Sequence, residues 1–565
     1  MTIFSNSATR QPGNRYNHHV KRPLTWLCLL LSLCLVACKP EPRQPVTESA
    51  AAAPDDTTPR DGGTLYRRLD ADIVSLNPVI PSSRYDRYVT NYLFTPMVYI
   101  DRSLQPIPGL AKSWDISDDG RVYRFNLDPK ATFSDGTPVR ASDVLFTLRR
   151  IVDPSTEAVQ VFGSFEQLDL ARSKAIDEHT VEIAFRAPLA MQLLRFNDLF
   201  VLPEHVYSKG NFRTDFNSRA VSTGPYKLVR REEGKEVVLE RRADYWREHP
   251  HIQNIVMKVV NDHNTAWNAL RRQEIDETLI ASDTWFREQK NPELNKYIDF
   301  RRFYTLNYNY IAWNGRNPLL KDKRVRRALS MAIPTDAVVQ DLYHGTARTM
   351  SGHFTPDEWA YNPNVPVIRY DPDGAKRLLA SLGWKDSDGD GVLENGSRDF
   401  SLQLLALSGS ATGKLLVQMV QAELKKIGVN VDLVILDTAT AIQRVMSGNY
   451  DAVYMGWDLD PDPDPYPLFH SSQVPPHGQN IVFYANAEAD RLIEAARKEL
   501  DRSKRKEMYW RLHEILAEDQ PYTWVVQASA KWGINKRVRG VDVSPGFGLF
   551  SWYPGELGWW LATAP

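Results

Sequence analysis

The chain has 565 residues, of which 42% are hydrophobic, 25% charged and 11% aromatic, and at about 100 to 200 residues per domain this length predicts several domains. The ordinary apolar content, with 30 Gly and 36 Pro, excludes collagen-like and disordered chains, and a single long apolar run excludes a polytopic membrane protein. A net charge of -1 provides no basic field for a polyanion, so no nucleic-acid partner is expected.

The N-terminal region predicts export. Four basic residues precede the apolar run 24–37, which is too short to span a bilayer comfortably but suits the apolar region of a signal peptide. The three cysteines of the chain are Cys28, Cys34 and Cys38, and the run ends directly before Cys38. This ending is similar to a lipobox, so residues 1–37 are interpreted as a lipoprotein signal peptide and Cys38 as the lipidated N-terminus. The alternative is an ordinary signal peptide with a chance cysteine.

Residues 38–61 predict a flexible tether. They are dominated by Pro, Ala, Thr and acidic residues and contain too little apolar surface to fold. A triacylated cysteine at one end would hold the protein stably at a membrane. We therefore expect a lipid-anchored protein on the periplasmic side of the cell envelope, with the choice between inner and outer membrane left open.

The rest of the chain alternates predicted strands and helices, which indicates an α/β fold. Period-two alternation predicts strands at 121–127 and 180–185, and a helical apolar stripe predicts a helix at 141–152. A strand, an amphipathic helix and a second strand at 400–407, 413–427 and 430–436 predict a right-handed βαβ unit.

One acidic loop resembles the first half of an EF-hand loop. Asp386, Asp388 and Asp390 occupy positions one, three and five, and a glycine occupies position six. Ser397 stands where the bidentate glutamate belongs, and Glu394 at position nine is a partial substitute. Structural calcium is the hypothesis, and a polar turn without a metal is the alternative. No other cofactor is expected.

A second acidic run alternates aspartate with Leu or Pro at 458–464. Because the prolines prevent a helix, we expect a stiff extended loop in which at most one or two carboxylates serve a site. The alternatives are a solvated acidic loop and a pair of catalytic carboxylates. The sequence has no metalloprotease or nucleophile-elbow motif. No enzymatic activity is predicted, and a Trp-rich secreted carbohydrate-active hydrolase is the rival from another class.

Seven segments, in order, resemble the bacterial extracellular solute-binding proteins of family 5, the dipeptide- and oligopeptide-binding lipoproteins of ABC importers. The resemblance covers essentially the whole chain after the signal peptide. The matching segments are 76–78, 108–127, 133–151, 222–229, 238–246, 321–333 and 450–457.

The resemblance implies a two-lobed periplasmic-binding-protein fold of type II, with an inserted domain and a hinge between the lobes. The implied lobe I comprises 62–93, 208–306 and 527–565. The inserted domain is 94–207, and lobe II is 307–526.

The resemblance also implies that a peptide binds between the lobes as an added strand, through its main chain. Met455, Gly456 and Trp457 match the strand that pairs with the ligand, with Gly456 allowing close approach and Trp457 offering a flat wall. The loop on the other lobe matches Ser82-Ser83-Arg84. An acidic residue is familiar at the position of Ser82, so this sequence departs from the oligopeptide-binding pattern there.

The family's ammonium-binding aspartate follows the tryptophan by three residues, and Asp460 has that spacing. Asp462 takes the role if the loop is shifted. The residue that binds the ligand carboxylate is not assigned. The implied function is capture of a peptide with a free N-terminus by a monomer and delivery to an inner-membrane ABC permease, with a metal chelate, an opine or an oligosaccharide as alternative solutes.

Overall fold

The computed structural model describes residues 58–81 and 83–562. The predicted signal peptide, Cys38, almost all of the tether and Ser82 lie outside this part of the chain. Within it, no helix combines the length and the apolar composition that a membrane span requires.

The first sheet is four-stranded, in the order β1-β10-β9-β8, and its strands come from the implied lobe I. β1 pairs in parallel with β10, whereas β10, β9 and β8 pair antiparallel. Helix α1 follows β1 and packs on β8. The bounds are β1 (Thr64–Leu69), α1 (Arg84–Leu93), β8 (Tyr226–Glu232), β9 (Glu236–Arg241) and β10 (Asn254–Val259).

The implied inserted domain holds a second four-stranded sheet, in the order β4-β5-β7-β6. The strands predicted at 121–127 and 180–185 are confirmed as β5 and β7, and the helix predicted at 141–152 is confirmed with the same bounds as α2. The bounds are β4 (Ala111–Ile116), β5 (Val122–Leu127), α2 (Ala141–Val152), α3 (Val159–Phe165), β6 (Lys174–Ala175), β7 (Thr180–Ala184), α4 (Gln192–Arg195) and α5 (Glu204–Tyr207).

A six-stranded mixed sheet forms the centre of the implied lobe II, in the order β14-β20-β13-β19-β17-β18. Apolar side chains on alternate positions of these strands enter two separate clusters, so both faces of the sheet are covered. The bounds are β13 (Asn307–Trp313), β14 (Ala347–Thr349), β17 (Ser401–Leu407), β18 (Asn430–Leu436), β19 (Ala452–Asp458) and β20 (Tyr522–Ala528).

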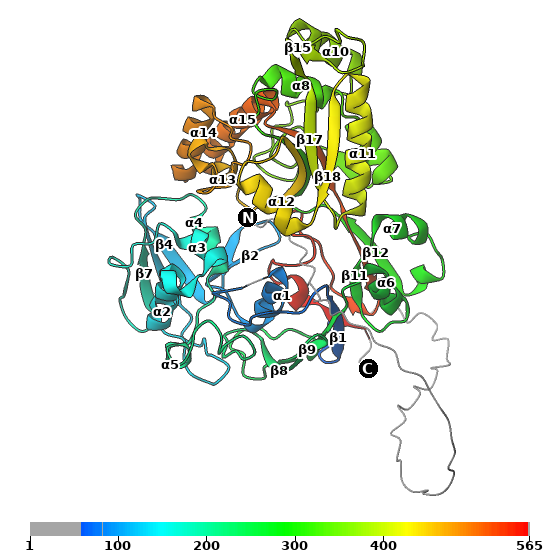
Figure 1. Ribbon diagram of the computed structural model, residues 1–565. Helices are drawn as coiled ribbons and strands as arrows, with labels where there is room; N and C mark the ends of the chain where they lie inside the picture. The colour runs from blue at the N-terminus through cyan, green and yellow to red at the C-terminus, as the bar shows by residue number, and fades with distance from the viewer. Residues whose placement is uncertain (1–57, 82, 563–565) are drawn as a thin grey trace, which may run out of the picture. The chain divides into compact units, whose positions relative to one another are not determined.

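The predicted βαβ unit is present as β17, α11 and β18. The two strands pair in parallel from Ser401 with Asn430 to Leu407 with Leu436, and helix α11 (Ala411–Lys426) packs along both (Figure 1). Ser410 caps the helix, since its Oγ accepts the N–H of Gly413 at 2.9 Å. The remaining long helices on this sheet are α8 (Lys323–Met331), α10 (Pro372–Ser381), α12 (Thr438–Met446), α14 (Ala487–Lys498) and α15 (Arg502–Asp519).

The chain passes twice between the six-stranded sheet and a three-stranded sheet ordered β11-β21-β12. These short crossings, at 304–306 and at Ser529, lie within three residues of the predicted lobe boundaries at 306/307 and 526/527, and the Gln527 side chain links them by donating to the Thr305 carbonyl at 2.8 Å. All strands of any one sheet belong to the same predicted domain, except that β20 extends two residues past the predicted end of lobe II at 526. The domain boundaries and the hinge stay predictions. The bounds are β11 (Glu277–Leu279), β12 (Ile298–Phe303) and β21 (Ala530–Asn535).

One buried carboxylate predicts a pH-dependent stability. Glu358 is 6% exposed, and burial raises its pKa to about 8. Its Oε2 accepts the N–H of Thr355, whereas its Oε1 has no hydrogen-bond partner among the described residues. At pH values between the pKa of Glu358 in the unfolded chain and about 8, the folded protein therefore binds a proton that the unfolded chain does not bind. Glu358 thus contributes stability at low pH that is lost as the pH rises.

The expected contribution changes by about 1.4 kcal/mol per pH unit between about pH 5 and 8. Glu358→Gln should remove this pH-dependent contribution. The free energy of unfolding of the variant, relative to that of the wild type, should therefore increase steadily from pH 5 to pH 8. Urea unfolding at four pH values measures the difference. Glu507→Gln, at an exposed position on α15, is the control, and parallel curves for wild type and Glu358→Gln would contradict the prediction.

Candidate functional site

One cavity of the described chain has a volume of about 260 Å³ and is lined by four separate segments. Two of them come from α1 and from the region of α4, one follows β19, and one belongs to the C-terminal region. The polar side chains of the wall are Arg87, Asn91, Arg195, Asn197, Asp198, Asp460, Asp462, Ser551 and Glu556. The predicted ammonium-binding residue Asp460 is thus on the cavity wall, and so is its alternative, Asp462.

Asp460 faces a cation that the sequence analysis did not find. Arg195, the last residue of α4, forms an ion pair with it, with 3.0 Å between Nη2 and Oδ2. The two side chains are 22% and 27% exposed. Asp460 and nearby carboxylates raise the pKa of Arg195 against the opposing effect of burial. Nothing in the local sequence of either residue indicates this pair, because it depends on how two distant segments pack.

Asp462 is engaged elsewhere. Both of its oxygens accept from Nη1 of Arg505, at 2.9 and 3.0 Å, and both side chains are almost fully buried. Tyr509 donates to the carbonyl of Pro463 at 2.9 Å and holds the same loop. Because this carboxylate is already neutralised in the interior, Asp460 is more available to a ligand than Asp462.

Trp457 does not form a wall of the cavity. It is fully buried, its ring stacks on Tyr310 with centroids 5.9 Å apart, and its Nε1 donates to the Tyr522 hydroxyl at 3.4 Å. Met455 is likewise buried in the core on the same face of the strand. The prediction of a flat wall at Trp457 was wrong for its ring, because odd-numbered side chains of β19 point into the core.

Packing within the sheet explains why residue 456 is a glycine. A Cβ at this position would lie 2.8 Å from Nδ2 of Asn309 on β13, so the glycine makes room for that side chain, and its role in close approach of a ligand stays a prediction. β13 pairs with β19 along its whole length, whereas β17 pairs on the other side only with Ala452 and Val453. The second edge of β19 therefore has no partner strand in the described chain from Tyr454 to Asp458.

The loop predicted on the other lobe begins helix α1. Ser83 is its N-cap and accepts the N–H of Asp86 at 3.2 Å, so its side chain serves the helix. Arg84 is the first helical residue, pairs with Asp70 at 3.6 Å and lines a second cavity of about 90 Å³. Ser82 lies outside the described residues, so its predicted role stays a prediction.

Two further carboxylates lie near the site: Asp458 opens the acidic run 458–464 but was given no role from the sequence, and Glu556 was not singled out. Burial raises the pKa of Asp458, at the end of β19, to about 6, while Arg84 acts to lower it. Burial also raises the pKa of Glu556, on the cavity wall, to about 7, against the attraction of Arg67. A perturbed carboxylate in a cavity is typical of a functional site, although burial in a fold produces the same effect.

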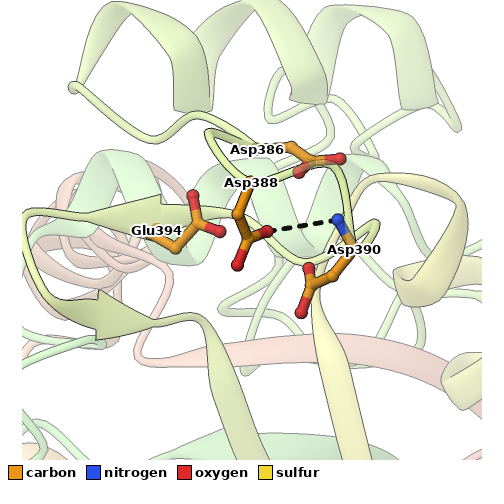
Figure 2. Close-up of side chains that lie close together, drawn as sticks. All are labelled: Asp386, Asp388, Asp390 and Glu394. Carbon is orange, nitrogen blue, oxygen red and sulfur yellow. Dashed lines mark hydrogen bonds between the residues drawn. The ribbon is translucent and has the colours of Figure 1, made fainter.

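The predicted calcium loop brings its four carboxylates together between α10 and β15 (Glu394–Asn395). Asp386, Asp388, Asp390 and Glu394 each offer an oxygen, and these atoms lie within 4.8 Å of one another (Figure 2). The three aspartates also accept backbone N–H groups within the loop. The grouping was predicted correctly, and oxygen ligands at this spacing fit calcium.

The mixed α/β chain, with a polar cavity lined by distant segments, has the fold of solute-binding proteins of known structure. The profile described as bacterial extracellular solute-binding proteins, family 5 (middle), matches residues 105–478. Since this is more than half of the chain, the protein belongs to family 5. It is an extracellular or periplasmic substrate-binding protein of an ABC importer, and it is not an enzyme.

Relatives with different ligands are similar to this chain. The oligopeptide-binding protein AppA of Bacillus subtilis is 29% identical over 549 residues, which cover 94% of this chain and 97% of AppA. The structure of AppA in complex with a nonapeptide matches with a TM-score of 0.74 at 27% identity, covering 90% of this chain and 100% of that one. NikZ of Campylobacter jejuni, in complex with Ni(L-His), matches with a TM-score of 0.74 at 26% identity, covering 89% and 100%.

Proposed function

We propose that this protein captures peptides with a free N-terminus and delivers them to an inner-membrane ABC permease. The observation that carries the proposal is the open edge of β19 from Tyr454 to Asp458, which ends beside the cavity. A peptide added along this edge gains main-chain hydrogen bonds that every peptide offers, whatever its side chains. The similarity to AppA supports the same ligand class.

Asp460 supplies the charge for the peptide N-terminus in this proposal. It lies two residues beyond the end of β19, on the cavity wall, and a quarter of its side chain is accessible. An α-ammonium group that reaches it forms a charge-assisted hydrogen bond, which contributes about 1.5 to 3 kcal/mol.

Mass spectrometry of ligands released by denaturing the purified protein tests the ligand class. Peptides of mixed sequence are expected, because main-chain recognition does not read side chains. The second candidate is a metal chelate, which the similarity to NikZ in complex with Ni(L-His) favours. A single small chelate together with stoichiometric metal would decide for that candidate and against peptides.

We also propose that Cys38 is lipidated and that residues 38–61 separate the anchor from the folded chain. Cys38→Ser should give an unlipidated precursor or a soluble protein with unchanged ligand affinity, because the described residues that line the cavity all lie beyond the tether. Membrane fractionation and titration calorimetry of the two proteins measure both properties. Loss of ligand binding in the variant would contradict the separation.

The loop 386–394 is proposed to bind calcium for stability. A ligand that binds only the native state raises its melting temperature by mass action, so a chelator should lower the melting temperature and added calcium should restore it. Asp388→Asn should reduce the response, whereas Asp432→Asn, at an exposed position on β18, should leave it intact. An unchanged melting temperature under excess chelator would exclude calcium at this loop.

A further inference from the structure

The ion pair between Asp460 and Arg195 is distinct from the other ion pairs around the cavity. Asp198 pairs with Arg87 at 2.6 Å and also accepts from the Ser164 hydroxyl at 2.8 Å. Asp462 and Asp464 pair with Arg505 and Arg497 on lobe II, at 2.9 and 3.3 Å. Asp198, Asp462 and Asp464 therefore each pair with an arginine other than Arg195, and Asp460 is the direct ion-pair partner of Arg195.

Both members of this pair keep polar atoms that no described residue engages. Asp460 contacts Arg195 through Oδ2, and its Oδ1 has no hydrogen bond or ion pair within the described chain. Arg195 uses Nη2 for Asp460 and for the Met191 sulfur at 3.7 Å, and its Nε and Nη1 form no hydrogen bond with a described residue. Neither nitrogen is among the buried polar atoms that lack a partner, so both retain solvent contact.

The pair thus presents an acceptor and a set of donors next to each other in the lining of the cavity. A ligand that brought only an ammonium group would add positive charge next to the guanidinium. A ligand that brings an oxygen acceptor next to its ammonium group satisfies both residues, since the ammonium donates to the carboxylate and the oxygen accepts from the guanidinium. An N-terminal α-amino acid residue carries its first carbonyl oxygen in this position.

We propose that Arg195 is a specificity-determining residue that binds the first carbonyl oxygen of the peptide while Asp460 binds its α-ammonium group. The site then recognises an α-aminoacyl unit through two contacts, and a chain that begins with a β-amino acid places the two groups one methylene further apart and fits less well. This inference rests on the proposed peptide function and extends it to the class of N-terminal residue.

The test compares glycyl and β-alanyl peptides of otherwise identical alanine sequence, each made as a tripeptide and as a nonapeptide. Titration calorimetry gives the ratio of the two dissociation constants for wild type, Arg195→Gln and Arg195→Lys. Arg213→Gln is the matched control, because Arg213 pairs with Glu157 at an exposed site away from the cavity. A hydrogen bond to a charged group predicts that wild type prefers the glycyl peptide by about tenfold or more.

The preference for the glycyl peptide should disappear in Arg195→Gln, with a ratio of dissociation constants near one. Arg195→Lys should keep only part of the preference, because lysine lacks the planar donor fork. Arg213→Gln should keep the full preference. Equal weakening of both peptides in Arg195→Gln would assign Arg195 a structural role, and tighter binding of both would make it a competitor of the ammonium group. Either result overturns the inference and leaves the peptide function standing. If wild type binds none of the four peptides, the peptide function fails and the inference fails with it.

Discussion

Asp460→Asn should weaken the binding of a free-amine peptide by about ten- to a hundredfold, which corresponds to about 1.5 to 3 kcal/mol. The amide keeps the size of the side chain but loses its charge, and it leaves the Arg195 guanidinium beside the incoming ammonium group without compensation. The stability should change by less than about 1 kcal/mol, because the ion pair is partly exposed. Titration calorimetry and urea unfolding measure the two quantities.

The N-acetylated form of the same peptide separates recognition of the amine from a general effect on the loop. It should bind wild type weakly and respond little to Asp460→Asn, since it has no ammonium group to lose. Asp432→Asn, on β18, provides a control for the removal of one negative charge elsewhere in the chain. An equal loss for the free and acetylated peptides would show that Asp460 shapes the loop and does not bind the amine.

Much of the local fold could be predicted because it follows from periodicity. α2 has the predicted bounds, and β17, α11 and β18 follow each other as predicted, since each buries one regular set of apolar side chains. The cap of α2 has a less regular pattern, since Arg140 is the N-cap residue and Asp143 accepts its N–H at 2.9 Å from inside the first turn.

The site could be predicted only in part, because its geometry depends on contacts between distant segments. The family resemblance indicated Asp460, which lines the cavity, but the direction of the Trp457 ring depends on Tyr310 and Tyr522 in neighbouring strands. The same limit applies to Arg195, whose role appears only when α4 meets the loop after β19. Residue type and spacing therefore indicated the loop, and packing decided which side chains face the cavity.

Because Asp462 is buried, removal of its arginine partner should have the largest expected effect on stability. Arg505→Met should lower the free energy of unfolding by about 3 to 5 kcal/mol, because it leaves the Asp462 carboxylate buried without its cation. Methionine keeps much of the volume of the arginine stem, so the loss of charge dominates. Urea unfolding at neutral pH measures the difference.

A partner variant on the same helix provides the control. Arg511 of α15 also forms ion pairs, with Glu488 and Glu514, but its side chain is 49% exposed, so Arg511→Met should cost less than about 1 kcal/mol. The double variant Arg505→Met/Asp462→Leu should recover most of the lost stability, because it removes the uncompensated charge and places apolar groups in a buried space. Similar small losses for Arg505→Met and Arg511→Met would mean that Asp462 finds water or another cation, and Asp462 would again compete with Asp460 for the ammonium group of a ligand.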